Sequence, residues 1–381
     1  MDVKFLFFQM LNCSLNKKVF KDISVERVSA EEWKELYHLS KSQGVTAVMF
    51  DVLSEAIEKK TIHTKPPREL ILQWYSHTMS IEKQMRMIKS HSEEFAKLMA
   101  ENGLTTCVLK GVALSNYYPN PLHREFGDLD CLLLEKNTTN DKWMSAYEKG
   151  NAIAEAQKIN VSRSLYKHSR FRYKRLTIEN HQFNLSVRGS KKAKELERYL
   201  RNILNEQNAH VIDFEQSPFL YPPADYNALF LTSHGIHHFL SEGIKIRQAL
   251  DWAIFLNAEY KRVNWKVFWS WCDKMHYTRF VECLNWICVK KMGLNENIIQ
   301  TVMNGRTENE DLEYLANRVF DDIFTANSIF NKGYSVFWMR MLVVRNFFLS
   351  AWKYKHIAQK NFLIDLLFRL SAMVWDRNPR I

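Results

Sequence analysis

Two aspartates stand directly before a short apolar run of the chain. Asp128 and Asp130 flank one leucine, and the segment Cys131 to Leu134 follows at once. Alternate residues of a β-strand point to the same face, so a strand here would present both carboxylates side by side. Two such carboxylates repel one another unless a cation lies between them. Mg²⁺, a hard ion that carboxylates, water and substrate phosphates coordinate, suits this arrangement, and phosphoryl or nucleotidyl transfer is the first hypothesis.

A third acid is expected in a later β-hairpin, with strands over 171–174 and 176–187. In the second strand Glu179 would share a face with His181 and with the apolar residues that follow it. A carboxylate on the core side is costly unless it is paired or binds a metal. We therefore predict Glu179 as the third metal ligand, with His181 supporting it through a hydrogen bond.

A lysine and a glycine form the predicted turn between a strand over 104–109 and a short helix over 112–118. A backbone that turns from strand to helix at a glycine can direct its N–H groups toward a phosphate. Lys110 would add a positive charge beside Gly111. Arg124 is a further candidate for contacting phosphate oxygens, since arginine binds them in a bidentate manner; its alternative role is pairing with a neighbouring carboxylate.

A histidine cluster lies farther along the chain, with His234 and His238 one helical turn apart. This spacing can hold zinc, and Asp251 is the only nearby third ligand, but no H-E-x-x-H pattern accompanies it. The preferred interpretation is that these histidines are polar residues at an interface between helices and face the cleft that holds the predicted site. Arg247, one turn before Asp251, is expected either to pair with it or to contact the nucleotide or acceptor.

Taken in order, these residues resemble the bacterial nucleotidyltransferase family of the DNA polymerase β-like superfamily. The stronger motifs are Val108-Leu109-Lys110-Gly111, Tyr118-Pro119, Arg124, Gly127-Asp128-Leu129-Asp130 and Ile178-Glu179-Asn180-His181. The fainter ones are His234-Gly235-Ile236-His237-His238, Gly243, Arg247 and Asp251. The motifs cover roughly residues 105 to 255, and their order carries more weight than any one of them.

The resemblance implies a small mixed sheet flanked by helices, in which Asp128 and Asp130 hold two Mg²⁺ ions and Glu179 completes the triad. Mn²⁺ is the alternative ion. Such a site moves a nucleoside monophosphate from a nucleoside triphosphate to an acceptor hydroxyl and releases pyrophosphate. One departure concerns the first turn, where many members have Gly-Ser or Gly-Gly, whereas Gly111 here lies between Lys110 and Val112.

Composition favours a folded, helix-rich protein with an anionic partner. The 381 residues carry a formal net charge of +11, which leaves nucleic acid open as a partner beside the triphosphate, although dispersed charge also serves solubility. The six cysteines form no C-x-x-C pair, as is typical of reduced thiols in a cytoplasmic protein. No uncharged run reaches the ~18 residues of a membrane span, so no transmembrane segment is expected.

The predicted fold class is α+β, with three parts. Residues 1–103 would form a helical region, in which one helix begins with a capping box at Ser29 and a long helix runs from about 68 to 101. Residues 104–223 would form the α/β core, and residues 224–381 a helical domain. The sequence does not identify the acceptor hydroxyl or the oligomeric state. Two alternative functions also agree with it: an inactive nucleotide- or RNA-binding protein of the same fold, and a toxin- or immunity-type component that modifies RNA or protein.

Overall fold

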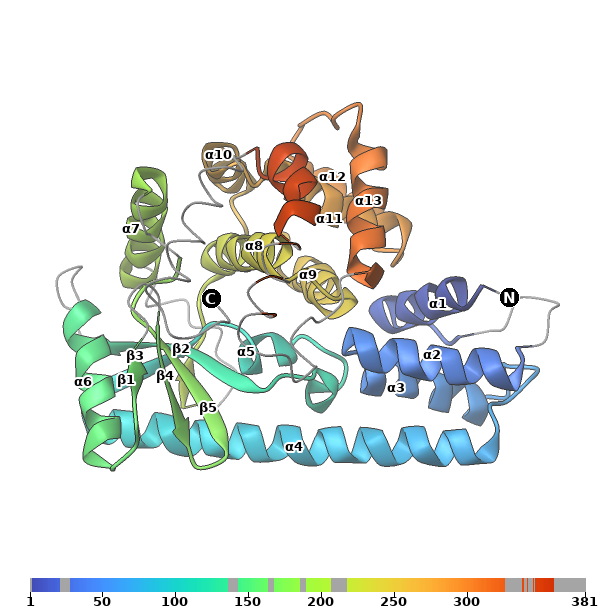
Figure 1. Ribbon diagram of the computed structural model, residues 1–381, viewed down its shortest axis with the longest axis horizontal. Coiled ribbons are helices and arrows are strands. Elements are labelled where there is room, and N and C mark those ends of the chain that lie inside the picture. Colours follow the sequence, from blue (N-terminus) through green and yellow to red (C-terminus); the bar gives the residue numbers. More distant parts are fainter. Residues whose placement is uncertain are drawn as a thin grey trace.

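A computed structural model describes residues 2–20, 28–135, 143–163, 168–185, 190–206 and 218–325, together with 338, 341, 345 and 347–359. Most of residues 326–381, the last part of the helical domain expected over 224–381, lie outside these residues. Within them, helices surround one mixed sheet, which confirms the predicted α+β class (Figure 1).

The N-terminal part consists of helices, as the sequence predicted. They are α1 (Val3–Asn16), α2 (Ala30–Gln43), α3 (Thr46–Glu58) and α4 (Arg68–Glu101). The predicted capping box begins α2: the Ser29 hydroxyl accepts from the Glu32 N–H, and the Glu32 carboxylate accepts from the Ser29 N–H.

Helix α4 connects the N-terminal helices to the sheet. Its 34 residues make it about 50 Å long, and it lies beneath both the sheet and α2–α3 (Figure 1). The sequence predicted both of its ends, because Pro66 and Pro67 precede it and the Asn102-Gly103 pair follows it. It is the element that the two regions share.

In the described part of the chain the strands form one six-stranded sheet in the order β3-β4-β5-β2-β1-β6. The strands are β1 (Leu104–Val108), β2 (Asp128–Glu135), β3 (Ser162–Arg163), β4 (His168–Tyr173), β5 (Leu176–His181) and β6 (Phe219–Leu220). The connecting segments include α5 (Val112–Ser115), the 3-10 turn Pro121–His123, α6 (Trp143–Ala156) and α7 (Lys191–Glu206). Strand β2 pairs antiparallel with β1 and parallel with β5, so it is central and buried.

Strand β5 is shorter than the sequence predicted. It ends at His181, so the alternation expected through 187 does not continue. The face of β5 that packs on the core carries the buried side chains of Leu176, Ile178 and Asn180. Glu179 points to the opposite face and reaches the site there, rather than lying among the later apolar residues.

The two faces of the sheet are covered by different helices. One face packs on α4 and α6, in a cluster that includes Phe95, Leu133 and Ile178. The other packs on α7 and on α8 (Ala224–Ser241), in a second cluster that includes Leu132 and Phe230. Asp128 and Asp130 alternate with Leu129 and Cys131 and so belong to the second face, between the sheet and α8.

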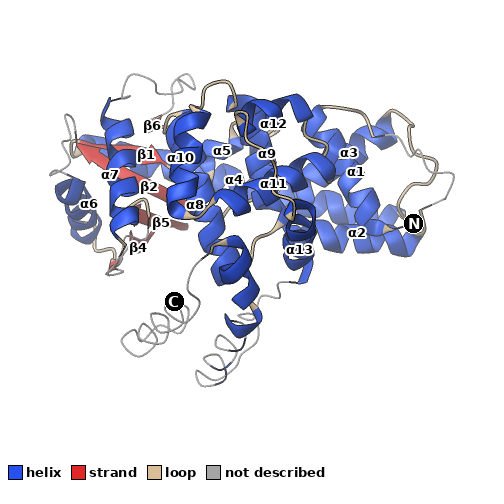
Figure 2. Ribbon diagram, turned by 90° about the horizontal axis from the view of Figure 1, so that it is seen from above, coloured by secondary structure: helices blue, strands red, loops and turns tan. Residues whose placement is uncertain are grey.

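The C-terminal part is helical. After α8 come α9 (Ile246–Glu259), α10 (Trp265–Met275), α11 (Thr278–Lys290), α12 (Glu296–Met303), α13 (Leu312–Thr325) and a π-helical turn (Lys353–Ile357). Their apolar side chains join those of α1–α3 in one cluster, and the two helical groups lie side by side (Figure 2). The three-part division of the chain stays a prediction. Among the described helices, none is long and apolar enough to cross a membrane.

Candidate active site

Three carboxylates converge where β2 and β5 pair. The parallel register sets Asp130 opposite Glu179 and Asp128 opposite Thr177, which places all three acids on the same face of the sheet. Each offers one oxygen, and these oxygens lie within 4.8 Å of one another. Asp130 is 2% exposed, whereas Asp128 and Glu179 are only partly buried. The group therefore has a buried base and an open side.

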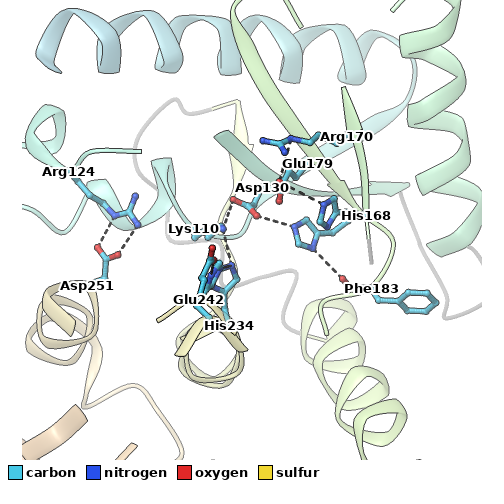
Figure 3. A network of polar contacts seen from close by, with 12 residues as sticks. Lys110, Arg124, Asp130, His168, Arg170, Glu179, Phe183, His234, Glu242 and Asp251 are labelled. Carbon is cyan, nitrogen blue, oxygen red and sulfur yellow. Dashed lines mark hydrogen bonds and ion pairs between the residues drawn. The ribbon is translucent and has the colours of Figure 1, made fainter. Parts of the chain in front are cut away.

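Lys110 neutralises the most buried of these acids. Its Nζ lies 3.0 Å from Oδ2 of Asp130, at the end of β1 next to β2 (Figure 3). Burial alone would lower the pKa of Lys110, but the charges of Asp130, Asp128 and Glu179 outweigh it and raise the pKa. Burial would likewise raise the pKa of Asp130, yet Lys110 and a hydrogen bond from His181 hold it well below its usual range.

His181 contacts the same carboxylate from β5. Its Nε2 lies 3.1 Å from Oδ1 of Asp130, and its Nδ1 lies 3.3 Å from the carbonyl oxygen of Phe183. We expected this ring to support Glu179; the structure shows it supporting Asp130 on the neighbouring strand. The side chain is fully buried.

The glycine turn after β1 is conformationally strained for any other residue. Gly111 has φ 56° and ψ −104°, and an added Cβ would lie 3.3 Å from the Phe126 ring and 3.5 Å from the Asp128 carbonyl oxygen. The turn therefore passes directly beside the first aspartate. The helix that follows, α5, is a single turn and shorter than the segment 112–118 that the sequence predicted.

A chain of polar contacts connects the site to α8. Lys110 Nζ lies 2.9 Å from Nε2 of His234, whose Nε2 lies 3.3 Å from Nε2 of His238. His238 in turn contacts Glu242. The expected position of these histidines, on a helix that faces the site, agrees with this arrangement (Figure 3).

Arg124 and Asp251 form a buried ion pair to one side of the carboxylates (Figure 3). The guanidinium donates from Nε and Nη2 to the two carboxylate oxygens, both at 2.8 Å, and the Tyr118 hydroxyl donates to Oδ1 at 2.7 Å. The expected Arg247–Asp251 pair is wrong, because Arg247 donates to the Glu125 carbonyl oxygen instead. Asp251 is thus engaged away from the histidines, which removes it as a third ligand for them.

Two basic residues of β4 were missed by the sequence analysis. His168 and Arg170 pair in register with His181 and Glu179, so they project from the same face as the acids. Both approach Oε1 of Glu179, with nitrogen to oxygen distances of 3.8 Å. Arg172 follows on this face and is exposed. Only the register of β4 against β5 reveals these neighbours.

The residues present fit a hard divalent cation. Three carboxylate oxygens lie within 4.8 Å of one another, the set contains no sulfur donor, and the ammonium of Lys110 already provides positive charge at Asp130. Oxygen donors of this kind are those that Mg²⁺ and Mn²⁺ prefer. The donor set therefore suits a divalent cation that prefers oxygen ligands.

Comparison with known proteins gives one match. A family described as uncharacterised nucleotidyltransferase matches residues 29–293, which is more than half of the chain and includes every residue of the site. No curated protein and no solved structure matches the chain. The matched region begins at α2 and ends just after α11, so it also contains helices outside the sheet.

Proposed function

Because the chain belongs to this family of uncharacterised nucleotidyltransferases, we propose that its carboxylate group transfers a nucleoside monophosphate from a nucleoside triphosphate to an acceptor hydroxyl, releasing pyrophosphate. The observation that supports this most directly is the meeting of Asp128, Asp130 and Glu179 on one sheet face. Three acids that repel one another and repel phosphate serve a cation-dependent reaction better than simple nucleotide binding.

In this proposal the three carboxylates hold Mg²⁺, with Mn²⁺ as the alternative. Bound ions of this type lower the pKa of an acceptor hydroxyl and neutralise charge on the leaving pyrophosphate. Glu179 and Asp128 form the open side, so they meet substrate oxygens, while buried Asp130 fixes the base of the site. His181 holds the Asp130 carboxylate in place from the neighbouring strand.

Positive groups around the acids are proposed to bind the triphosphate. Lys110 lies between Asp130 and His234, and Gly111 lets the backbone approach closely. Arg170 and Arg172 extend from β4 over the same face and are exposed. These two arginines are better placed for phosphate than Arg124, because Arg124 is 5% exposed and already bidentate to Asp251.

The test incubates the full-length protein with Mg²⁺, each α-labelled nucleoside triphosphate and a cell extract, beside the variant Asp130→Asn. We expect label transfer and pyrophosphate release from the unmodified protein. In the variant both should fall by at least about 10²-fold, the scale of losing one preorganised electrostatic contact. Glu296→Gln, which removes an exposed carboxylate on α12, is the matched control and should keep the activity.

Triphosphate binding by the unmodified protein, without transfer of any of the four labels, would refute the proposed reaction. It would favour a protein that only binds nucleotide or RNA. Transfer that persists in Asp130→Asn would instead mean that the reaction takes place without the carboxylate group. The label-bearing product, separated as small molecule, RNA or protein, identifies the acceptor.

A further inference from the structure

Three side chains beside the proposed reaction centre form a second group of metal-ligand type. His168 of β4 and Glu179 and His181 of β5 each offer one ligand atom, and these atoms lie within 4.8 Å of one another. Only Glu179 also belongs to the carboxylate group. The other two bring imidazole nitrogens, which have a different preference for metals.

The backbone fixes this arrangement. The antiparallel register sets His168 directly opposite His181, and directly opposed residues of a strand pair have their Cβ atoms about 5 Å apart. The two rings lie 5.3 Å apart between centroids. Glu179, two residues before His181, shares its face. The three ligands therefore come from two rigid strands that are bonded to each other.

The surroundings of His181 favour a cation at one ring nitrogen. Its Nδ1 faces the carbonyl oxygen of Phe183 and its Nε2 faces Oδ1 of Asp130, and both oxygens only accept hydrogen bonds. A histidine that binds a metal commonly donates its other N–H to a backbone carbonyl. When Nδ1–H donates to the Phe183 carbonyl oxygen, an ion bound at Nε2 would take the place of the hydrogen that otherwise joins Nε2 to Asp130, and Asp130 would add negative charge beside that ion.

We propose that His168, Glu179 and His181 bind a divalent transition-metal ion of the zinc class. Two imidazoles and one carboxylate are a known ligand set for zinc, whereas Mg²⁺ prefers oxygen ligands alone. Ligand atoms around a tetrahedral zinc ion lie about 3.3 Å from one another, so atoms that now lie within 4.8 Å of one another need side-chain shifts of under about 1 Å. Open coordination positions remain for water or substrate.

Glu179 connects the two metal-ligand groups. Since it belongs to both, its carboxylate would be able to bind both the transition-metal ion and an ion held by Asp128 and Asp130. If the proposed nucleotidyl transfer holds, Glu179 would connect two unlike ions that together provide the chemistry of a two-metal site. Binding of the transition metal itself does not depend on that reaction.

Cobalt(II) is the probe, because its visible absorption reports coordination by nitrogen ligands. Full-length protein, stripped of metal with a chelator and kept in excess Mg²⁺, is titrated with Co²⁺. We expect one tightly bound Co²⁺ per chain, displaced by Zn²⁺ and not by Mg²⁺. His168→Gln should weaken binding at least about 10²-fold, since even a second-shell change costs 10- to 100-fold. This residue is the primary test because its side chain is 23% exposed, so the variant should fold.

Two variants serve as matched controls. Asp128→Asn changes the carboxylate group alone, and His238→Gln removes a histidine of the pair on α8; both should keep the cobalt spectrum. Loss of the spectrum in His238→Gln, with its retention in His168→Gln, would place the ion on α8 and overturn the proposal. Displacement by Mg²⁺ would overturn it as well, because it indicates an all-oxygen site.

These experiments test the metal site separately from the proposed reaction. Cobalt binding that depends on His168 in a protein that transfers no label would support this site and refute the reaction. Label transfer with Mg²⁺ alone, in a protein that binds no Co²⁺, would do the opposite. Thermal unfolding of His168→Gln in the absence of metal serves to show that the variant is folded.

Discussion

At the scale of single residues, Lys110 acts as a built-in cation for the site. It pairs with Asp130, whose side chain is almost fully buried, and its own side chain is 19% exposed. An acid in such a position is stable only with a positive partner. A bound divalent ion would compete with Lys110 for this carboxylate and release the ammonium toward a phosphate.

This competition predicts the behaviour of Lys110→Met. In metal-free buffer the variant should lose about 3 kcal/mol of unfolding free energy, because removing one partner of a buried pair leaves an uncompensated charge. Mg²⁺ should restore part of this loss and should bind the variant more tightly than the unmodified protein, since no lysine has to be displaced. Urea unfolding with and without Mg²⁺ measures both effects.

An exposed lysine provides the control for this prediction. Lys59 pairs with Glu55 on the surface of α3, with both side chains largely in solvent. Lys59→Met should change the stability by under about 1 kcal/mol, and Mg²⁺ should add nothing specific. Equal losses in the two variants, or a Lys110→Met protein that does not respond to Mg²⁺, would contradict the assigned role of Lys110.

At the scale of secondary-structure elements, the turn before β2 is anchored by His123. Its Nδ1 lies 2.6 Å from Asp51 on α3 and its Nε2 lies 2.9 Å from Glu82 on α4. Burial would lower the pKa of His123, but these two carboxylates outweigh burial and raise the pKa. The imidazolium therefore joins two helices to the loop that leads into Asp128.

The raised pKa gives a defined pH dependence. Because the folded pKa exceeds the unfolded value of about 6.5, the stabilisation is complete below about pH 6.5 and is lost as pH rises through the folded pKa. The difference in unfolding free energy between the unmodified protein and His123→Gln should be about 1.5 to 3 kcal/mol at pH 6 and shrink at higher pH. Chemical denaturation at several pH values measures it.

The exposed His63 gives the comparison for this series. His63→Gln removes an imidazole from the surface and should change the free energy of unfolding by under about 0.5 kcal/mol. A difference between the unmodified protein and His123→Gln that grows with rising pH would contradict the sign, and would mean that His123 is neutral when it contacts the two carboxylates.

Elements with strong local signals were predictable from the sequence. The capping residues of α2, both ends of α4 and the apolar run of β2 were each visible in consecutive residues, and the structure confirms them. The carboxylates of the site were expected for a similar reason, since Asp128 and Asp130 alternate along one strand. Local spacing alone sufficed for these features.

Neighbours across strands were not predictable in the same way. His168 and Arg170 lie beside Glu179 only because β4 pairs with β5 in one particular register, and β4 alone carries no sign of it. The alternation that we extended to residue 187 is interrupted after His181, where the chain leaves the sheet. Arg124 similarly found its partner on α9, 127 residues away.

At the scale of the whole molecule, the loop before β2 is where the N-terminal helices, the sheet and the C-terminal helices meet. Glu125 accepts from the Thr46 N–H at the start of α3, at 3.0 Å, and its carbonyl oxygen accepts from Arg247 of α9. Arg124, next to it, binds Asp251 of α9. Contacts from both helical regions therefore hold the segment that positions Asp128.

Removing one partner of the buried pair should affect the whole fold. Asp251→Leu leaves the Arg124 guanidinium without its carboxylate, and we expect a loss of about 3 to 5 kcal/mol in unfolding free energy. Combining it with Arg124→Met and Tyr118→Phe replaces all three polar partners by apolar groups. The combined variant should recover most of the stability, because apolar replacements of buried ion pairs are often close to neutral.

The combined variant also separates the two roles that Arg124 can have. The structure engages its Nε and Nη2 with Asp251 but gives Nη1, which is buried, no hydrogen-bond partner among the described residues. If Arg124 only anchors the loop, the combined variant regains label transfer together with stability. If Nη1 binds a phosphate oxygen, stability returns while the KM for the triphosphate stays raised, by about tenfold or more for a lost charged hydrogen bond of at least about 1.5 kcal/mol. We expect the first result, because Arg170 and Arg172 of β4 are exposed on the face of the site and are better placed to bind the triphosphate than the buried Arg124.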